Sequence, residues 1–192
     1  MYCYTDYPTA ELFLNGKSQG KTSKNPSERL DRYRLRWNNV KYEPGELKVV
    51  VYDAVGNAAG EQSIHTAGKP AKLALDVWTQ SANLSPLTSH LSPLKASGDD
   101  FAFITVSLTD ANGTLIPDAS DQLTFEVTGA GTFEAVCNGD ATSLEPFKQP
   151  TMKLFNGQLV VIVRSGHQPG TLTLKVTDTK LNISESIDIQ IN

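Results

Sequence analysis

The sequence predicts an all-β protein built from two antiparallel β-sandwiches in tandem. Apolar and polar side chains alternate in short runs, which is the pattern of strands with one buried face. Turn signals rich in Gly, Asn and Pro separate these runs at short spacing. No stretch of the 192 residues indicates a helix of useful length.

The first predicted element is a β-hairpin over residues 8–22. Its centre is Asn15-Gly16, and an Asn-Gly pair is a strong hairpin signal because both residues tolerate positive φ angles. A polar stretch then leads to a half-buried strand with alternating arginines. The side chains expected on the buried face of that strand are Tyr33, Leu35 and Trp37.

Two more strands complete the first module. A Pro-Gly turn precedes a strand over 47–53, and a second turn leads to a short strand over 62–66. We therefore expect the first module to span residues 1–67. Met1 stands so close to the hairpin that we expect the first strand of this module to be clipped.

The second module is expected to span residues 68–192. Small residues, a glycine and a proline over 66–70 interrupt the strand rhythm and mark the boundary. A Ser- and Pro-rich segment over 79–93 is expected to be a loop. About seven strands are expected, over 72–78, 101–108, 123–128, 132–136, 159–163, 172–176 and 187–191. The fifth of these is apolar on both faces, which predicts a central strand.

A long segment from Ala135 to Gly166 connects two of these strands and is either a site or a structural brace. Its polar side chains lack a titratable partner, and Asn-Gly corners stand at both ends, which favours a loop held by its own side chains. We therefore expect a brace. The residues expected to hold it are Asn138, Gly139, Asp140, Phe155, Asn156 and Gly157.

Composition argues against several classes of partner. The net charge is −4 with both signs interspersed, so we expect neither a nucleic-acid partner nor a membrane partner. Cys3 and Cys137 stand far apart without a CxxC motif, which predicts two inert thiols rather than a zinc site or a disulfide framework.

No motif indicates a catalytic, cofactor or metal site, and we expect none. The histidines lack the spacing of a metal motif and are expected at the surface; they are His65, His90 and His167. Four acidic residues fall at predicted turns, where Asp makes local hydrogen bonds: Asp99, Asp100, Asp118 and Asp121. The segment from Asp110 to Gly113 opens like a calcium loop but lacks the downstream glutamate.

Exposed aromatic residues would allow a carbohydrate-binding surface, which is an alternative hypothesis, since sugar rings stack on aromatic faces. Trp37 shares a row with Leu35 and is expected in the core. Trp78 ends a strand beside a polar loop and is the possible carbohydrate contact. Four tyrosines are also available: Tyr2, Tyr4, Tyr7 and Tyr42.

Two groups of motifs carry a family resemblance. AELFLNGKSQGK from Ala10 and RLRWNNVKYEPGELKVVVYD from Arg34 resemble the sandwich behind the catalytic barrel of glycoside hydrolase family 2, the β-galactosidase family. KASGDDFAFITVSLTDANGTLIPDA from Lys95, with the segment around Asn138-Gly139-Asp140, resembles the C-terminal immunoglobulin-like domain of the Bacteroides-type enzymes.

The resemblance implies two immunoglobulin-like sandwiches that are accessory to a hydrolase. The catalytic glutamates of that family lie in a barrel upstream of these modules, so no catalytic role carries over to this chain. Expected partners are the barrel of its own parent chain, polysaccharide, or a second copy, in a periplasmic or extracellular location. A carbohydrate-binding module and an adhesin-like cell-surface sandwich are the alternatives.

Overall fold

A computed structural model describes residues 1–79 and 93–192. Over these residues the chain forms fourteen strands and no helix, which confirms the all-β prediction. The chain divides into two compact units, unit 1 (Met1–Thr66) and unit 2 (Ala67–Asn192). The loop expected over 79–93, together with His90, falls almost entirely on residues 80–92, outside the described residues.

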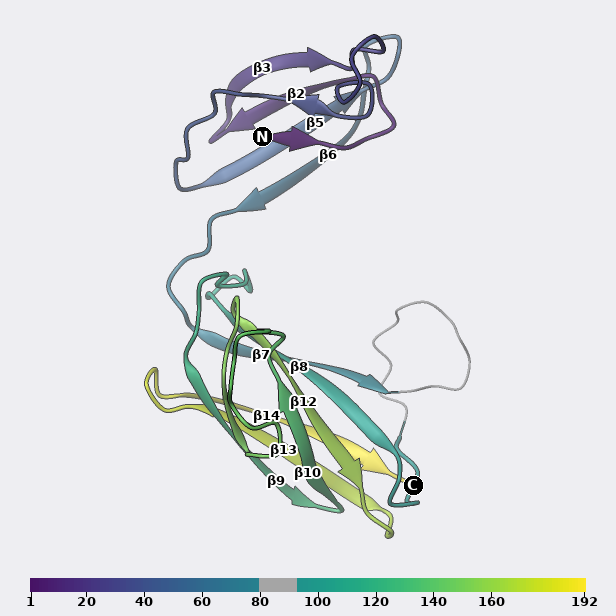
Figure 1. The fold of residues 1–192 in the computed structure, drawn as a ribbon, viewed down its shortest axis with the longest axis vertical. Coiled ribbons are helices and arrows are strands. Elements are labelled where there is room, and N and C mark those ends of the chain that lie inside the picture. The colour runs from purple at the N-terminus through teal and green to yellow at the C-terminus, as the bar shows by residue number, and fades with distance from the viewer. Residues whose placement is uncertain (80–92) are drawn as a thin grey trace. The chain divides into compact units, whose positions relative to one another are not determined.

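Unit 1 is built on a four-stranded antiparallel sheet with the order β3-β2-β5-β6 (Figure 1). The predicted hairpin is confirmed, with Asn15 and Gly16 at φ angles of 50° and 77°. A two-stranded sheet of β1 and β4 lies against the four-stranded one. The strands are β1 (Tyr2–Cys3), β2 (Thr9–Leu14), β3 (Lys17–Ser23), β4 (Leu35–Arg36), β5 (Glu46–Tyr52) and β6 (Ala58–His65).

Two predictions for unit 1 were partly wrong. Leu35 and Trp37 are buried as expected, but Tyr33 is 66% exposed and lies before β4. Its backbone N–H bonds to the carbonyl of Leu30, because the polar segment before it folds into consecutive turns. The strand expected over 62–66 begins earlier, at Ala58.

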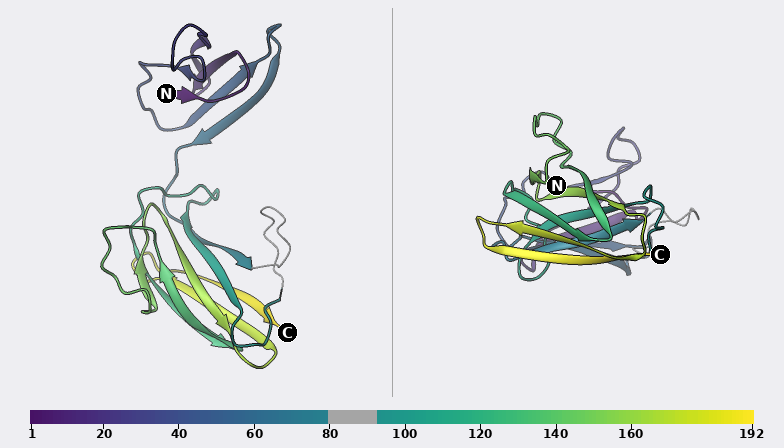
Figure 2. Two further views of the ribbon diagram at one scale, coloured as in Figure 1. Left: turned by 45° about the vertical axis from the view of Figure 1, so that its right-hand side comes forward. Right: turned by 90° about the horizontal axis from the view of Figure 1, so that it is seen from below.

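Unit 2 is a sandwich of two four-stranded sheets, drawn as two layers in Figures 1 and 2. The first sheet has the order β10-β12-β8-β7 and the second has the order β11-β9-β13-β14. The strands are β7 (Lys72–Thr79), β8 (Phe101–Thr109), β9 (Gln122–Gly129), β10 (Gly131–Cys137), β11 (Thr151–Lys153), β12 (Gln158–Ser165), β13 (Gly170–Asp178) and β14 (Ile183–Ile191).

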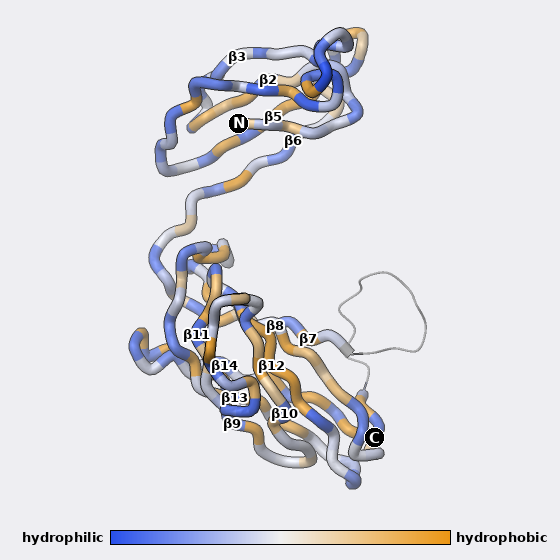
Figure 3. Tube along the Cα trace, in the orientation of Figure 1, coloured by the Kyte–Doolittle hydropathy of each residue, from blue (hydrophilic) through white to orange (hydrophobic). Residues whose placement is uncertain are grey.

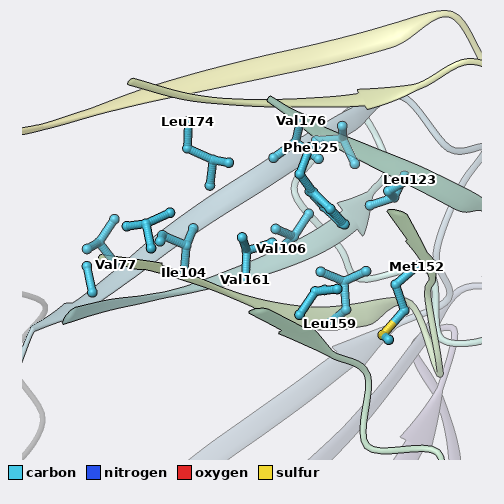
Figure 4. Close-up of a cluster of buried hydrophobic side chains, with 14 of the residues drawn as sticks. Val77, Ile104, Val106, Leu123, Phe125, Met152, Leu159, Val161, Leu174 and Val176 are labelled. Atoms are coloured by element: carbon cyan, nitrogen blue, oxygen red, sulfur yellow. The ribbon is translucent and has the colours of Figure 1, made fainter. Parts of the chain in front are cut away.

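The core of unit 2 lies between these sheets. Apolar residues concentrate along β7, β8 and β12 (Figure 3), and β12 lies between β10 and β8, as its predicted central position requires. Figure 4 shows Leu174 and Val176 of one sheet pointing toward Ile104 and Val161 of the other. The described part of the unit has eight strands rather than about seven, because β11 was missed within the long loop.

Candidate functional site

The loop between β10 and β12 is held by the side chains of its own residues. Asn138 Nδ2 donates to the carbonyl oxygen of Lys153 at 3.0 Å, and Asn138 Oδ1 accepts from the backbone N–H of Asp140 at 3.0 Å. Asp140 Oδ1 in turn accepts from the hydroxyl and the backbone N–H of Thr142. These two hydrogen bonds hold the pKa of Asp140 below its usual range.

A glutamate that the sequence did not single out supports the same loop. Glu145 Oε1 accepts from the backbone N–H of Lys153 and from Gln122 Nε2, at 3.3 Å each. Backbone bonds join the loop to its flanking strands, from Val136 N to Phe147 O and from Phe125 N to Pro150 O, both 2.9 Å. The loop is thus tied along its length to the strands beside it.

The far end of the loop is a tight hairpin at Asn156-Gly157, whose φ angles are 51° and 79°. Gly157 is bonded on both sides: its N–H donates to Ala119 O at 3.0 Å, and its carbonyl oxygen accepts from Leu108 N at 2.9 Å. A Cβ at this position would collide with the carbonyl oxygen of Ile116. Only glycine fits here without displacing the backbone.

The loop also contributes to the core. Met152 on β11 is fully buried and Leu154 is 2% exposed, and both belong to the core cluster of unit 2. Phe155 is 41% exposed, and Leu144 is 97% exposed. Phe147 is 59% exposed as well, so the loop contributes Met152 and Leu154 to the core while its other large apolar side chains face solvent.

The two tryptophans differ in environment. Trp37 is buried, and its Nε1 donates to Gly20 O at 2.7 Å, which confirms the expected core position. Trp78 is 41% exposed. It pairs with Phe103, which pairs with Ile162, and directly opposed residues share a face of a sheet. Trp78 therefore begins an apolar row across the outer face of the first sheet.

Of the four acidic residues predicted at turns, Asp100 makes local hydrogen bonds, Asp99 and Asp121 form ion pairs with distant residues, and Asp118 is exposed. Asp99 pairs with Arg164 at 2.9 Å, Asp100 accepts from Lys95 N, and Asp121 pairs with Lys180. Among the described histidines, His65 and His167 are exposed. Within residues 1–79 and 93–192, no three His, Cys, Asp or Glu side chains are grouped as a metal site.

Both cysteines are free and half-buried, Cys3 in unit 1 and Cys137 in unit 2. Burial raises the pKa of the Cys3 thiol, and the charge of Lys24 opposes this by less. A raised thiol pKa disfavours the reactive thiolate, in keeping with the expectation of an inert cysteine.

Asp110 is a buried carboxylate that organises a turn. Its oxygens accept from the backbone N–H groups of Gly68, Thr114 and Asn112 at 2.8–2.9 Å. These bonds hold the pKa of Asp110 below its usual range. The Asp-x-Asn-Gly pattern is typical of such turns, and it is the feature of the sequence that indicates this structural role.

The hydrogen bonds of Asp110 predict a loss of stability in acid. The unfolded pKa is about 3.9 and the folded pKa is lower, so the stabilisation is complete well above the unfolded value and is lost as the pH falls through the folded value. We expect Asp110→Asn to lower the melting temperature of unit 2 at pH 7, and this deficit to shrink toward pH 3. Asp118→Asn, at an exposed turn, is the control. An equal deficit at both pH values would contradict the prediction.

Comparison with known families decides which family the chain belongs to. Residues 86–186 match the family described as glycoside hydrolase family 2 C-terminal domain 5. The chain belongs to this family. Residues 1–60 match a domain of unknown function, DUF4982. The family resemblance noted from the sequence is confirmed. Over the described residues, no helix of this family 2 chain is long and apolar enough to cross a membrane.

Relatives of this family 2 chain are much longer than it is. A β-galactosidase from Bacteroides ovatus is 37% identical over 182 residues, which are 94% of this chain and 19% of the relative. A β-glucuronidase from Formosa agariphila is 30% identical over 91% of this chain and 16% of its own length. The chain thus spans about a fifth of the length of the curated relatives it matches.

Solved structures agree with this assignment. A glycosyl hydrolase family 2 member from Bacteroides cellulosilyticus matches with a TM-score of 0.82 and 26% identity, over 100% of this chain and 22% of that one. A β-glycosidase from Bacteroides vulgatus matches with a TM-score of 0.76 and 28% identity, over 98% and 22%. The chain is therefore a C-terminal part of family 2 glycoside hydrolases.

Proposed function

We propose that residues 1–192 are a non-catalytic, structural part of a longer family 2 glycosidase. The observation that carries this proposal is the match in length: relatives align with nearly all of this chain, which makes up only 16–19% of them. The greater part of such a protein provides a catalytic barrel, as the family resemblance implies. The chain stabilises that barrel by packing on it or by joining copies of the enzyme.

The substrate class follows from the relative with the higher identity. That relative is a β-galactosidase, so we propose a β-galactoside-hydrolysing parent. The less similar relative, at 30% identity, is a β-glucuronidase. Both names denote hydrolysis of a β-linked sugar, which is the part of the proposal that both relatives support.

Removal of residues 1–192 from the complete parent enzyme tests the structural role. We expect the truncated enzyme to melt at a lower temperature, because it loses a packed surface, while each folded molecule keeps its kcat on a small chromogenic β-galactoside. Melting by scanning calorimetry and kcat per active site are the two measurements. An unchanged melting temperature with an unchanged oligomeric state would overturn the proposed role.

Carbohydrate binding is the second candidate function, and the exposure of Trp78 favours it. The row formed by Trp78, Phe103 and Ile162 offers an apolar face on which a sugar ring can stack. In this case truncation, or Trp78→Ala alone, raises KM for a polymeric galactan and leaves KM for the small chromogenic substrate unchanged. A purely structural role predicts that the altered enzyme and the intact enzyme have the same KM for each of the two substrates.

A further inference from the structure

Unit 1 has an open groove of about 340 Å³ on the inner face of its larger sheet. Leu12, Leu47 and Val49 are among the side chains that line it, with Trp37 beside them. Residues of β1 line the groove, and so do residues of β6, from Gln62 to Ile64. The groove therefore lies between two strands that belong to different sheets.

The groove forms because the two layers of unit 1 differ in width. The larger sheet has four strands, but the layer against it has only β4 and β1, and β4 contacts β3 at the far side. Within the described residues, β1 pairs only with β4 and β6 pairs only with β5. Both strands therefore present a free hydrogen-bonding edge beside the groove.

The burial of the inward-facing side chains decreases across the larger sheet, from β2 through β5 to β6. On β2 the inward side chains Ala10 and Leu12 are 0% and 4% exposed. Their neighbours Leu47 and Val49 on β5 are only half-buried. On β6, which pairs with β5 next, Ile64 lies opposite Leu47 and is 60% exposed. The inner face is thus covered over β2 and uncovered over β5 and β6.

The uncovered edge lacks two of the features that keep edge strands apart, Lys and Pro, although it carries Glu61 and has a register shift opposite Val51 and Tyr52. Strand β6 has eight residues, all of them exposed, and its sequence AAGEQSIH contains neither Lys nor Pro. Proteins usually protect a long free edge with Lys, with Pro or with a covering segment. The side chains that line the groove among the described residues carry no charge, and the ammonium group of Met1 already donates to the carbonyl oxygen of Trp37. An extended peptide with alternating apolar residues fits these properties.

We propose that this groove receives an extended segment of the parent polypeptide from outside residues 1–192. The segment adds a strand beside β1 and covers Leu47, Val49 and Ile64 with its apolar side chains, which is strand addition within one protein. The parent supplies the segment because relatives are about five times longer than the chain. The inference rests on the proposed function, since the segment belongs to the proposed parent enzyme.

Hydrogen–deuterium exchange on the complete parent enzyme and on residues 1–192 alone tests this inference. We expect the amides of β6 to exchange more than about tenfold more slowly in the parent. The amides of β3, at the opposite edge of the same sheet, are the internal control and should change less. Equal exchange of β6 in both samples would overturn the inference.

A matched pair of substitutions distinguishes the loss of a segment bound in the groove from a general effect of adding a lysine to unit 1. Ile64 is 60% exposed in the groove, and Val55 is 87% exposed at a turn of the same unit. In residues 1–192 alone, Ile64→Lys and Val55→Lys should both leave the melting temperature nearly unchanged. In the parent, only Ile64→Lys should abolish the slow exchange of β6. Loss of protection with both variants, or with neither, would contradict the inference.

Two further results decide between occupants. Slow exchange of β6 that appears in residues 1–192 as their concentration rises would identify a second copy in the groove and overturn the inference. Glycosidase activity of the same parent sample is measured separately. An inactive parent with a protected β6 would overturn the proposed function alone, and an active parent with an unprotected β6 would overturn the groove inference alone.

Discussion

Met152→Ala is expected to lower the free energy of unfolding of unit 2 by about 2–5 kcal/mol, the range for truncating a buried methionine. Met152 is fully buried on β11 and packs in the core between the two sheets (Figure 4). The loss follows because the neighbouring strands cannot close the cavity completely. Urea unfolding followed at Trp78, in a Trp37→Phe background that removes the unit 1 signal, measures it.

Leu144→Ala is the control for this measurement. Leu144 lies in the same loop but is 97% exposed, so its truncation should change the stability of unit 2 by no more than about 0.5 kcal/mol. If the two variants unfold at the same urea concentration, the loop does not contribute to the core and is not a brace.

Gly157→Ala is expected to destabilise unit 2 more than Gly139→Ala, although both glycines have nearly the same φ angle, 79° and 78°. Each substitution costs about 1–2 kcal/mol for the left-handed backbone. At Gly157 the new Cβ also collides with the carbonyl oxygen of Ile116, which adds about 1–3 kcal/mol of overpacking. At Gly139 a Cβ has nothing within 4 Å.

Comparison of the two glycine variants by urea unfolding isolates the steric contribution, since the backbone cost is common to both. Equal losses would show that the segment around Ile116 moves aside freely. In that case Gly157 would be a turn residue without a packing role, and this end of the loop would not be fixed to the sandwich.

The strands of unit 2 could be predicted because their periodicity is simple. In β8 the side chains of Ala102, Ile104, Val106 and Leu108 are all buried, and the intervening ones are not, with the expected period of two. The hairpin at Asn15-Gly16 was equally clear, because few residues tolerate the two positive φ angles it needs.

Elements that depend on distant partners could not be predicted. Strand β11 has only three residues, too few for a pattern, and Met152 is buried because β9 and the opposite sheet surround it. Tyr33 fits the alternation of the next strand, but the turns before it leave it exposed.

Sites formed by spatial neighbours were the hardest to foresee. Glu145 supports Lys153 and Gln122, which are 8 and 23 residues away, and no local motif marks it. The groove of unit 1 likewise arises from a difference in strand number between two layers, and strand count is not a property of any one segment.

Assay of purified residues 1–192 with chromogenic β-galactosides tests the central claim, that this part of the enzyme is not catalytic, most directly. The structural role predicts product release no faster than in buffer at any chain concentration, while the complete parent enzyme turns over in the same assay. Product release in proportion to the concentration of the chain, which persists through repeated purification and is lost on unfolding, would contradict the claim.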